Sequence, residues 1–244
     1  MTKQKRTTQR GNVLFYVLIA VALVAALSIA ITNSLRGNTT DVEDNRAGII
    51  AGEILDISNI YATAVAQLRL RGVLEENLCF DDPGWEDFQE DDYYYHAACE
   101  TTTNRIFHPD GAALVWSRMP RDAFVKSFRP GDEPDYLFHI ISDNEIQDVG
   151  STCSEPKCSE LLFVIDELSE KVCREINKLL GIEARNDEVP EDNVYGDIRF
   201  RGRYNFSETI GDTADSRVLR GRLAGCFESQ SQDVFVFYKV LISR

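Results

Sequence analysis

The chain has 244 residues and a formal net charge of −14. The first eleven residues contain four basic side chains and no acid, so an overall −14 and a leader of +4 leave −18 on the remainder. A surface this acidic argues against nucleic acid or anionic lipid headgroups as binding partners, because both require a basic footprint. We therefore expect no nucleic-acid partner.

Residues 12–31, NVLFYVLIAVALVAALSIAI, contain no charged side chain. As a helix, a segment of this length covers roughly the 30 Å hydrocarbon core of a bilayer. Four basic residues precede it, whereas Arg36 is the only basic residue between the segment and Arg46. By the positive-inside rule, we expect a single-pass protein of a bacterial inner membrane. Its N-terminus would be cytoplasmic, and the chain after Leu35 would be periplasmic or extracellular.

A short basic leader ends in glycine immediately before this apolar segment, in the sequence RGNVLFY of residues 10–16. This junction resembles the class III leader of type IV prepilins and pseudopilins. The resemblance implies that a prepilin peptidase cuts between Gly11 and Asn12 and methylates the new amino terminus. It further implies that the apolar helix docks against other pilin-like subunits at an assembly platform. Two other interpretations stay open: a secretory signal cleaved after Ser28-Ile29-Ala30, and a plain uncleaved anchor.

Tyr16 occupies the position at which major pilins carry a glutamate, five residues into the mature chain. A neutral phenol cannot neutralise the charged amino terminus of a neighbouring subunit in a low-dielectric filament core. Minor, tip-located pseudopilins also lack this acid. The resemblance therefore implies that Tyr16 is an interaction residue of a minor subunit, or of a pilin-like protein that forms no filament.

We expect four parts: a leader at 1–11, a transmembrane helix at 12–31, a linker with an amphipathic helix at 32–72, and an exported head at 73–244. Residues 35–40, LRGNTT, predict a helix break, with a second helix starting near Asp41. Gly72 suits a C-terminal cap. The apolar residues of this second helix recur every three or four positions, a spacing that any amphipathic helix packed on a sheet, or a short coiled coil, would also show. The second helix carries one apolar stripe at Ile50, Ile54, Ile57, Tyr61, Ala64 and Leu68.

All six cysteines follow the apolar segment. An even number in an oxidising compartment indicates three disulfides, although six cysteines allow fifteen connectivities. One or two free buried thiols are the alternative. Our prediction pairs neighbours in the sequence: Cys79 with Cys99, Cys153 with Cys158, and Cys173 with Cys226.

The head has the pattern of an α+β domain with an antiparallel-rich sheet packed on the amphipathic helix. Alternating or continuous apolar runs predict strands at 113–116, 135–141, 161–165, 197–206, 222–227 and 233–242, the last two forming a hairpin. A helix is predicted at 168–180, with Gly181 closing it. In the strand at 197–206, Ile198, Phe200, Tyr204 and Phe206 would share one face, and Arg199, Arg201 and Arg203 the other.

Two segments are candidate interaction surfaces. Tyr93, Tyr94 and Tyr95 lie in an acidic segment between Cys79 and Cys99 and could form an exposed contact patch. Calcium binding by the acids of this segment is an alternative, although no EF-hand spacing is present. The arginine row could bind an acidic patch on another subunit, or it could be a solvated sheet face.

The chain lacks the nucleophile-elbow, P-loop, HExxH and GxGxxG motifs. His96, Cys99 and His108 have a spacing that could hold zinc, but a cysteine outside the cytoplasm is expected in a disulfide. We predict no catalytic residue, no metal site and no cofactor. The sequence thus favours a non-catalytic pilin-like or pseudopilin-like subunit, with a membrane-tethered periplasmic binding module as the alternative.

Overall fold

The computed structural model describes residues 13–81, 94–125, 138–150, 159–183, 188–193, 195–196 and 198–244. The predicted cleavage site at Gly11 and Asn12, Tyr93, and the pair Cys153 and Cys158 lie outside these residues. The chain divides into two compact units, residues 1–45 and 46–244, which are described separately. We call the second unit the body.

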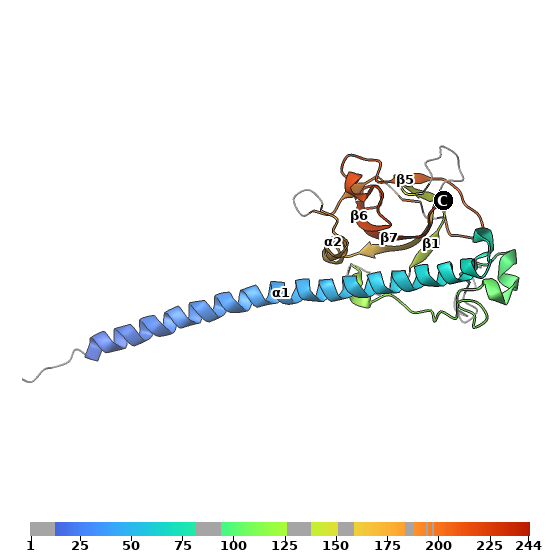
Figure 1. Ribbon diagram of the computed structural model, residues 1–244. Helices are drawn as coiled ribbons and strands as arrows, with labels where there is room; N and C mark the ends of the chain where they lie inside the picture. The colour runs from blue at the N-terminus through green and yellow to red at the C-terminus, as the bar shows by residue number, and fades with distance from the viewer. Residues whose placement is uncertain are drawn as a thin grey trace, which may run out of the picture. The chain divides into compact units, whose positions relative to one another are not determined.

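Helix α1 extends from Val13 to Leu70 (Figure 1). Residues 35–40 are helical, so the predicted break, and a separate helix beginning near Asp41, are wrong. A glycine such as Gly37 costs a helix only about 1 kcal/mol relative to alanine. Each added residue of a helix that has already formed contributes one more backbone hydrogen bond. The long helical segments on both sides therefore carry the helix through this weak stretch.

Helix α1 ends where the sequence predicts, just before the glycine cap at Gly72. Gly72 has φ 90°, in the left-handed region that suits glycine. Its N–H donates to the carbonyl of Arg69 at 2.9 Å, and the N–H of Val73 donates to the carbonyl of Leu68 at 3.1 Å. These two bonds form a Schellman motif, which satisfies carbonyls that the last helical turn would leave unpaired.

After α1, the described residues of the body form short 3₁₀ turns, one further helix and two sheets (Figure 1). The 3₁₀ turns are η1 (Glu75–Asn77), η2 (Ala97–Glu100), η3 (Thr102–Asn104), η4 (Arg121–Ala123) and η6 (Arg217–Leu219). The second helix is α2 (Glu170–Leu179). The strands are β1 (His139–Ile141), β2 (Asn144–Ile146), β3 (Leu161–Leu168), β4 (Glu191–Asp192), β5 (Glu208–Ile210), β6 (Ala224–Ser229) and β7 (Val234–Ile242).

The main sheet has the strand order β1-β3-β7-β6-β4, and all neighbouring pairs are antiparallel except β4 with β6. β6 and β7 form the predicted C-terminal hairpin, in register Cys226 with Phe237. A second sheet consists of the parallel pair β2 and β5. The α+β class and the largely antiparallel sheet are confirmed.

One face of the main sheet packs against α1 and α2. Ile50, Ile54, Tyr61, Ala64 and Leu68 are buried and Ile57 is half-buried, which confirms the predicted stripe. The Tyr61 ring lies against Phe138 and Phe163, with centroid distances of 4.7 and 5.0 Å. The helix face therefore meets an aromatic cluster at the edge of the sheet.

The opposite face of the sheet is also covered. Val164 and Tyr238 on this face pack with Ile146 of β2, Ile210 of β5 and Leu219 in a second apolar cluster. Because both faces are buried, β3 has the continuous apolar sequence Leu161–Leu162–Phe163–Val164–Ile165 rather than an alternating one.

Two predicted strands are wrong. Residues 113–116 belong to no strand, and Ala113 has φ 55°, outside the extended region of a strand. The segment 198–206 makes only an isolated bridge between Arg199 and Ile141. Gly202, with φ 72°, turns the chain there, so the apolar residues do not share one face: Phe200 is fully buried, while Ile198 and Phe206 are each 44% exposed. For the strand predicted at 135–141, His139–Ile141 form β1, and residues 135–137 lie outside the described part.

Two of the predicted disulfides are confirmed, Cys79–Cys99 and Cys173–Cys226, with Cα–Cα distances of 5.2 and 5.4 Å. The second joins α2 to β6 and closes a loop with a sequence separation of 53. In the loop-entropy model such a crosslink stabilises the folded chain by about 4 kcal/mol. The face of the sheet on which α1 rests is thus held covalently to α2.

Candidate functional site

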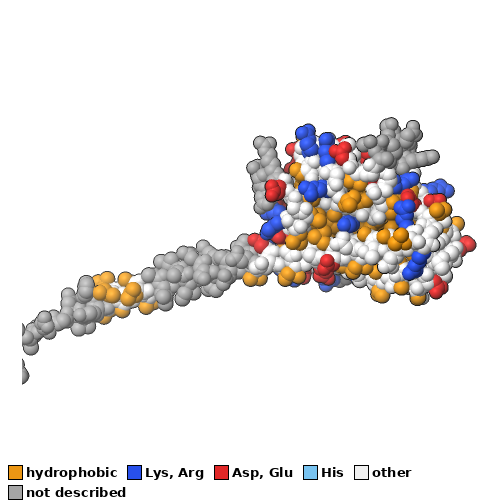
Figure 2. Space-filling model, in the orientation of Figure 1, with side chains coloured by type: hydrophobic (Ala, Val, Ile, Leu, Met, Phe, Trp, Pro, Cys, Tyr) orange, Lys and Arg blue, Asp and Glu red, His pale blue; other side chains and the backbone are white. Residues whose placement is uncertain are grey.

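The first unit presents an apolar helix surface. Residues 17–25 of α1 are exposed without exception, and the large apolar side chains among them are 43–65% exposed. Figure 2 shows these side chains as an orange band on the helix. A helix that is apolar all round is typical of a segment surrounded by lipid or by other apolar helices. This set, Val17, Leu18, Ile19, Val21, Leu23 and Val24, is named the apolar collar.

In the described part of the chain, one helix is long and apolar enough to span a membrane. The helical stretch that meets this criterion is Val42–Leu70, and 39% of its most apolar 18-residue window is buried. Its apolar stripe packs against the sheet, so the core of the body already accounts for its apolar content. The apolar collar has no such cover within its own unit and is the better candidate for a lipid contact.

Tyr16 lies in the first turn of α1, and its side chain is outside the described set. The structure therefore leaves its predicted contact role as a prediction.

The tyrosine patch predicted at 93–95 is not exposed as expected. Tyr94 is 7% exposed, and its phenol oxygen accepts a hydrogen bond from the N–H of Ile140 at 3.1 Å. This bond satisfies a donor of β1, an edge strand, which is why Tyr94 turns inward. Tyr95 is 37% exposed, so among the described tyrosines of this segment it alone lies on the surface.

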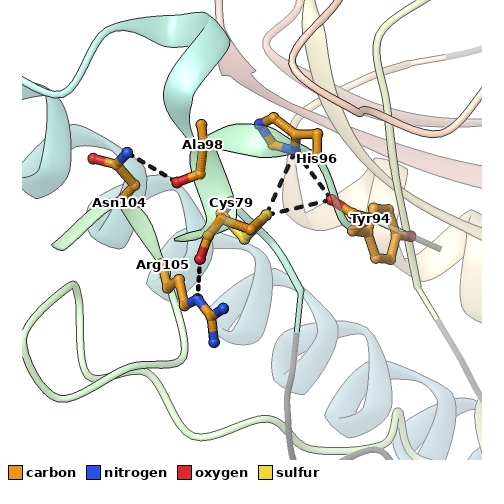
Figure 3. The surroundings of a disulfide bond; sticks show 7 residues. Cys79, Tyr94, His96, Ala98, Asn104 and Arg105 are labelled. Carbon is orange, nitrogen blue, oxygen red and sulfur yellow. Dashed lines mark hydrogen bonds between the residues drawn. A yellow bond between two sulfur atoms is a disulfide. The ribbon is translucent and has the colours of Figure 1, made fainter. Parts of the chain in front are cut away.

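Polar contacts hold the segment around the Cys79–Cys99 disulfide (Figure 3). His96 Nδ1 lies 3.1 Å from the Tyr94 carbonyl and 3.5 Å from Cys99 Sγ. The Arg105 Nε donates to the carbonyl of Cys99 at 2.5 Å. Because the Cys99 sulfur is bonded to Cys79, it is not available as a thiolate ligand, and the zinc alternative is wrong. In the described residues, no group of three or more His, Cys, Asp or Glu side chains could hold a metal ion.

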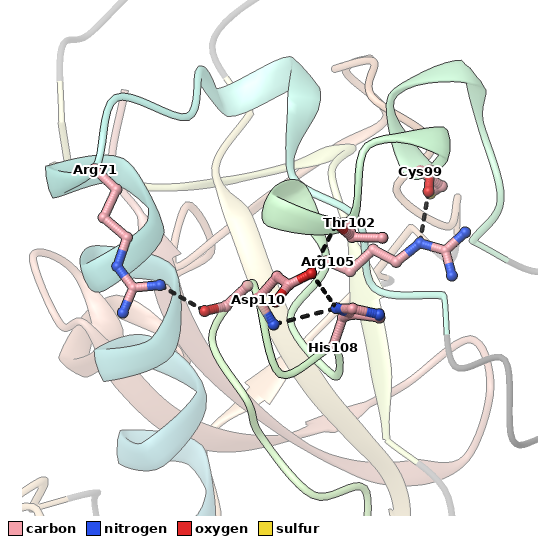
Figure 4. Close-up of polar contacts among 7 residues, drawn as sticks. Arg71, Cys99, Thr102, Arg105, His108 and Asp110 are labelled. Carbon is pink, nitrogen blue, oxygen red and sulfur yellow. Dashed lines mark hydrogen bonds and ion pairs between the residues drawn. The ribbon is translucent and has the colours of Figure 1, made fainter.

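Contacts between α1 and the turn at 108–111 complete this end of the body (Figure 4). The Arg71 Nη1 donates to the Gly111 carbonyl at 2.6 Å, and the Asp110 N–H donates to His108 Nδ1 at 3.1 Å. His108 to Gly111 form a turn, in which the Gly111 N–H donates to the His108 carbonyl at 2.9 Å. A Cβ on Gly111 would lie 1.8 Å from the Arg105 carbonyl oxygen, so the position requires glycine. These contacts stabilise the fold at this end of the body.

The arginine row does not line one sheet face. Arg201 and Arg203 are exposed, whereas Arg199 is half-buried, with Nη2 3.5 Å from His139 Nδ1. His139 Nε2 in turn lies 3.9 Å from Asp166 Oδ1, and the Tyr195 hydroxyl donates to Asp166 Oδ2 at 2.7 Å. No sequence pattern indicates this cluster, because its members come from β1, β3 and the connection between β4 and β5.

Tyrosine, aspartate and histidine can move protons, and in this cluster their side chains form a continuous series of polar contacts from Arg199 to Tyr195. Cavities of about 510 and 370 Å³ beside the described residues are lined by other side chains. The arrangement is that of a half-buried polar network at the edge of the sheet.

Comparison of the chain with protein-family models, with curated proteins and with solved structures gives no match. The features that bear on function are the apolar collar, the helix that enters the core of the body, and the disulfide-held α+β body.

Proposed function

We propose that this protein is a non-catalytic pilin-like or pseudopilin-like subunit of a pilus or secretion-type system. It is anchored in the bacterial inner membrane by residues 12–31, with the leader in the cytoplasm and the body in the periplasm or outside the cell. It acts by assembly or protein interaction. The apolar collar, which lies in the apolar segment 12–31 that follows the leader, is the observation that carries this proposal.

The free energy gained by removing the apolar collar from water supports a membrane or helix–helix environment. Covering one large aliphatic side chain contributes about 1.5–3 kcal/mol. Six such side chains, 43–65% exposed, therefore favour lipid or neighbouring apolar helices over water by several kcal/mol. No charged residue interrupts residues 12–31, so a bilayer can accept the whole segment.

The continuity of α1 supports a mechanical role. The same helix that carries the apolar collar supplies Ile54, Tyr61 and Leu68 to the core of the body. In this proposal one helix contributes both to a membrane or filament core and to the core of an exported body. Tyr16 in place of a glutamate favours a minor subunit over the repeating subunit of a filament.

The leader provides the decisive experiment. The intact mass of the protein from membranes would be measured for the wild type and for Gly11→Val. The proposal expects a mature wild type that starts at methylated Asn12 and a variant that remains full length. Gly52→Val is the matched control, because a Cβ at Gly52 meets nothing within 4 Å, and it should be processed as the wild type is.

Two other outcomes contradict the proposal. A wild type that begins at Met1 indicates a membrane-tethered binding module. One that begins at Ile31 indicates a secreted protein whose apolar segment is a cleaved signal.

A further inference from the structure

Glu160 connects the two sheets of the body. It immediately precedes β3 and is fully buried. Its backbone N–H donates to the carbonyl of Asn144 at 2.9 Å, and its Oε2 accepts the N–H of Ile146 at 2.8 Å. Both partners belong to β2, so Glu160 connects the small β2–β5 sheet to the start of β3.

The carboxyl group of Glu160 has little support for a negative charge. Its Oε1 has no hydrogen-bond partner among the described residues. The charged groups of the described chain that act on it are Glu145 of β2, whose charge opposes ionisation, and Arg244 after β7, whose charge favours it. Burial is the largest cause, and it raises the pKa of Glu160 to about 8.

Arg244 is already engaged elsewhere. Its Nε lies 3.2 Å from Glu75 Oε2, and its guanidinium carbon lies 4.0 Å above the centre of the Tyr204 ring. The guanidinium is therefore directed to the end of α1 and does not form an ion pair with Glu160 in the described contacts. The backbone N–H groups of Ile146 and of Glu160 itself would stabilise a Glu160 carboxylate, but the effect of burial is larger than theirs.

Loss of the proton leaves a carboxylate that must reach water. A buried charge that backbone N–H groups compensate only in part is costly, and movement of the side chain to solvent breaks the bond to Ile146. The small sheet has only three residue pairs, from Asn144 with Glu208 to Ile146 with Ile210. Local opening of so small a unit requires less free energy than global unfolding.

We propose that Glu160 is a pH-sensitive latch, which holds β2 on β3 while its carboxyl group is protonated and releases the β2–β5 sheet when it gives its proton to solvent. Release uncovers Ile146 and Ile210, which the closed body buries. The body thus has two states that differ in apolar surface, and external pH selects between them. This proposal does not depend on the proposed function.

Hydrogen exchange followed by mass spectrometry tests the latch on the full chain in detergent. Rates would be corrected for the intrinsic pH dependence of exchange. The pKa of Glu160 is raised in the closed state and ordinary in the open state. Rising pH therefore favours opening, and the opening constant stops rising above the pKa of the closed state. Between pH 6 and pH 8 the opening constant of residues 144–146 and 208–210 should rise about fiftyfold.

Glu160→Gln keeps an oxygen acceptor for Ile146 and cannot ionise, so its opening constant should not change over this range. Glu53→Gln, an exposed acid on α1, is the matched control and should behave as the wild type. Glu145→Gln removes a charge that opposes ionisation and should move the transition to lower pH.

The wild type alone keeps the test decisive if Glu160→Gln fails to fold. A pH response confined to β2 and β5, with α2 and the β6–β7 hairpin unchanged, supports the latch. An equal response of all elements, or none, overturns it, as does a Glu160→Gln variant that opens with pH as the wild type does.

Discussion

Helix α1 contains two apolar regions that have opposite surroundings. In residues 17–25 apolar side chains lie all round the helix and are exposed, whereas in residues 50–68 they form one stripe that the body buries. The comparison teaches that the arrangement of apolar residues round a helix, more than their number, indicates whether a helix meets lipid or a protein core.

Charge in the first region should have the largest effect. Val21→Arg combined with Val24→Arg places two cations in the apolar collar, which costs membrane insertion about 5–7 kcal/mol at the helix centre. We expect the protein to leave the membrane fraction after carbonate extraction. Val115→Arg, at a body position that is 83% exposed, is the control and should stay in membranes. Retention of the double variant in the bilayer would show that the collar is not the anchor.

Truncation in the second region should destabilise the body instead. Leu68 is fully buried, so Leu68→Ala should lower the free energy of unfolding by about 2–5 kcal/mol, measured by denaturant titration. Ile49→Ala, on the same helix at a position that is 73% exposed, should change it by less than about 0.5 kcal/mol. Equal effects at the two positions would contradict the packing of α1 on the sheet.

The body, into which the second region packs, should respond to pH, whereas the apolar segment that contains the first region should not. The pKa of Glu160 is raised to about 8 in the folded body, so the protonated form favours folding. Stability is therefore greatest below the ordinary pKa of glutamate and is lost as pH rises to about 8, by roughly 3 kcal/mol between pH 5 and pH 8. Thermal unfolding should show this loss in the wild type and not in Glu160→Gln. Residues 12–31 carry no charged side chain, so their helicity should not respond. A body whose stability is constant over this range would refute the assignment to Glu160.

A glycine between the two regions should give the smallest effect. Gly37 lies within α1, and Gly37→Ala should stabilise the helix by up to about 1 kcal/mol. Slower amide exchange at residues 35–40 would be the readout. Gly72→Ala is the opposite case, because φ is 90° there and alanine should destabilise the helix end. No change in exchange at 35–40 would mean that this stretch is not helical in solution.

Several features could be predicted from local sequence because local physics decides them. Spacings of three and four residues predicted the stripe from Ile50 to Leu68, and a glycine after the last apolar position predicted the cap at Gly72. The apolar runs at 161–165 and 233–242 predicted β3 and the second strand of the terminal hairpin. Cysteines paired with their neighbours in the sequence at Cys79–Cys99 and Cys173–Cys226.

Only the tertiary structure decided the features that depend on distant partners. Tyr94 is buried because the edge strand β1 needs an acceptor for the Ile140 N–H, 46 residues further along the chain. Arg199 leaves its row because Gly202 turns the chain and His139 lies nearby.

Glu160 is the clearest example of the difference between what local sequence determines and what the tertiary structure determines. Its sequence neighbours mark it as the last polar residue before an apolar strand, and nothing local predicts a buried acid. The sequence by itself determined which segments are apolar, how they repeat and where they end, because propensity and periodicity act over a few residues. The fold alone decided which polar groups lose water, because burial depends on contacts between segments that folding brings together.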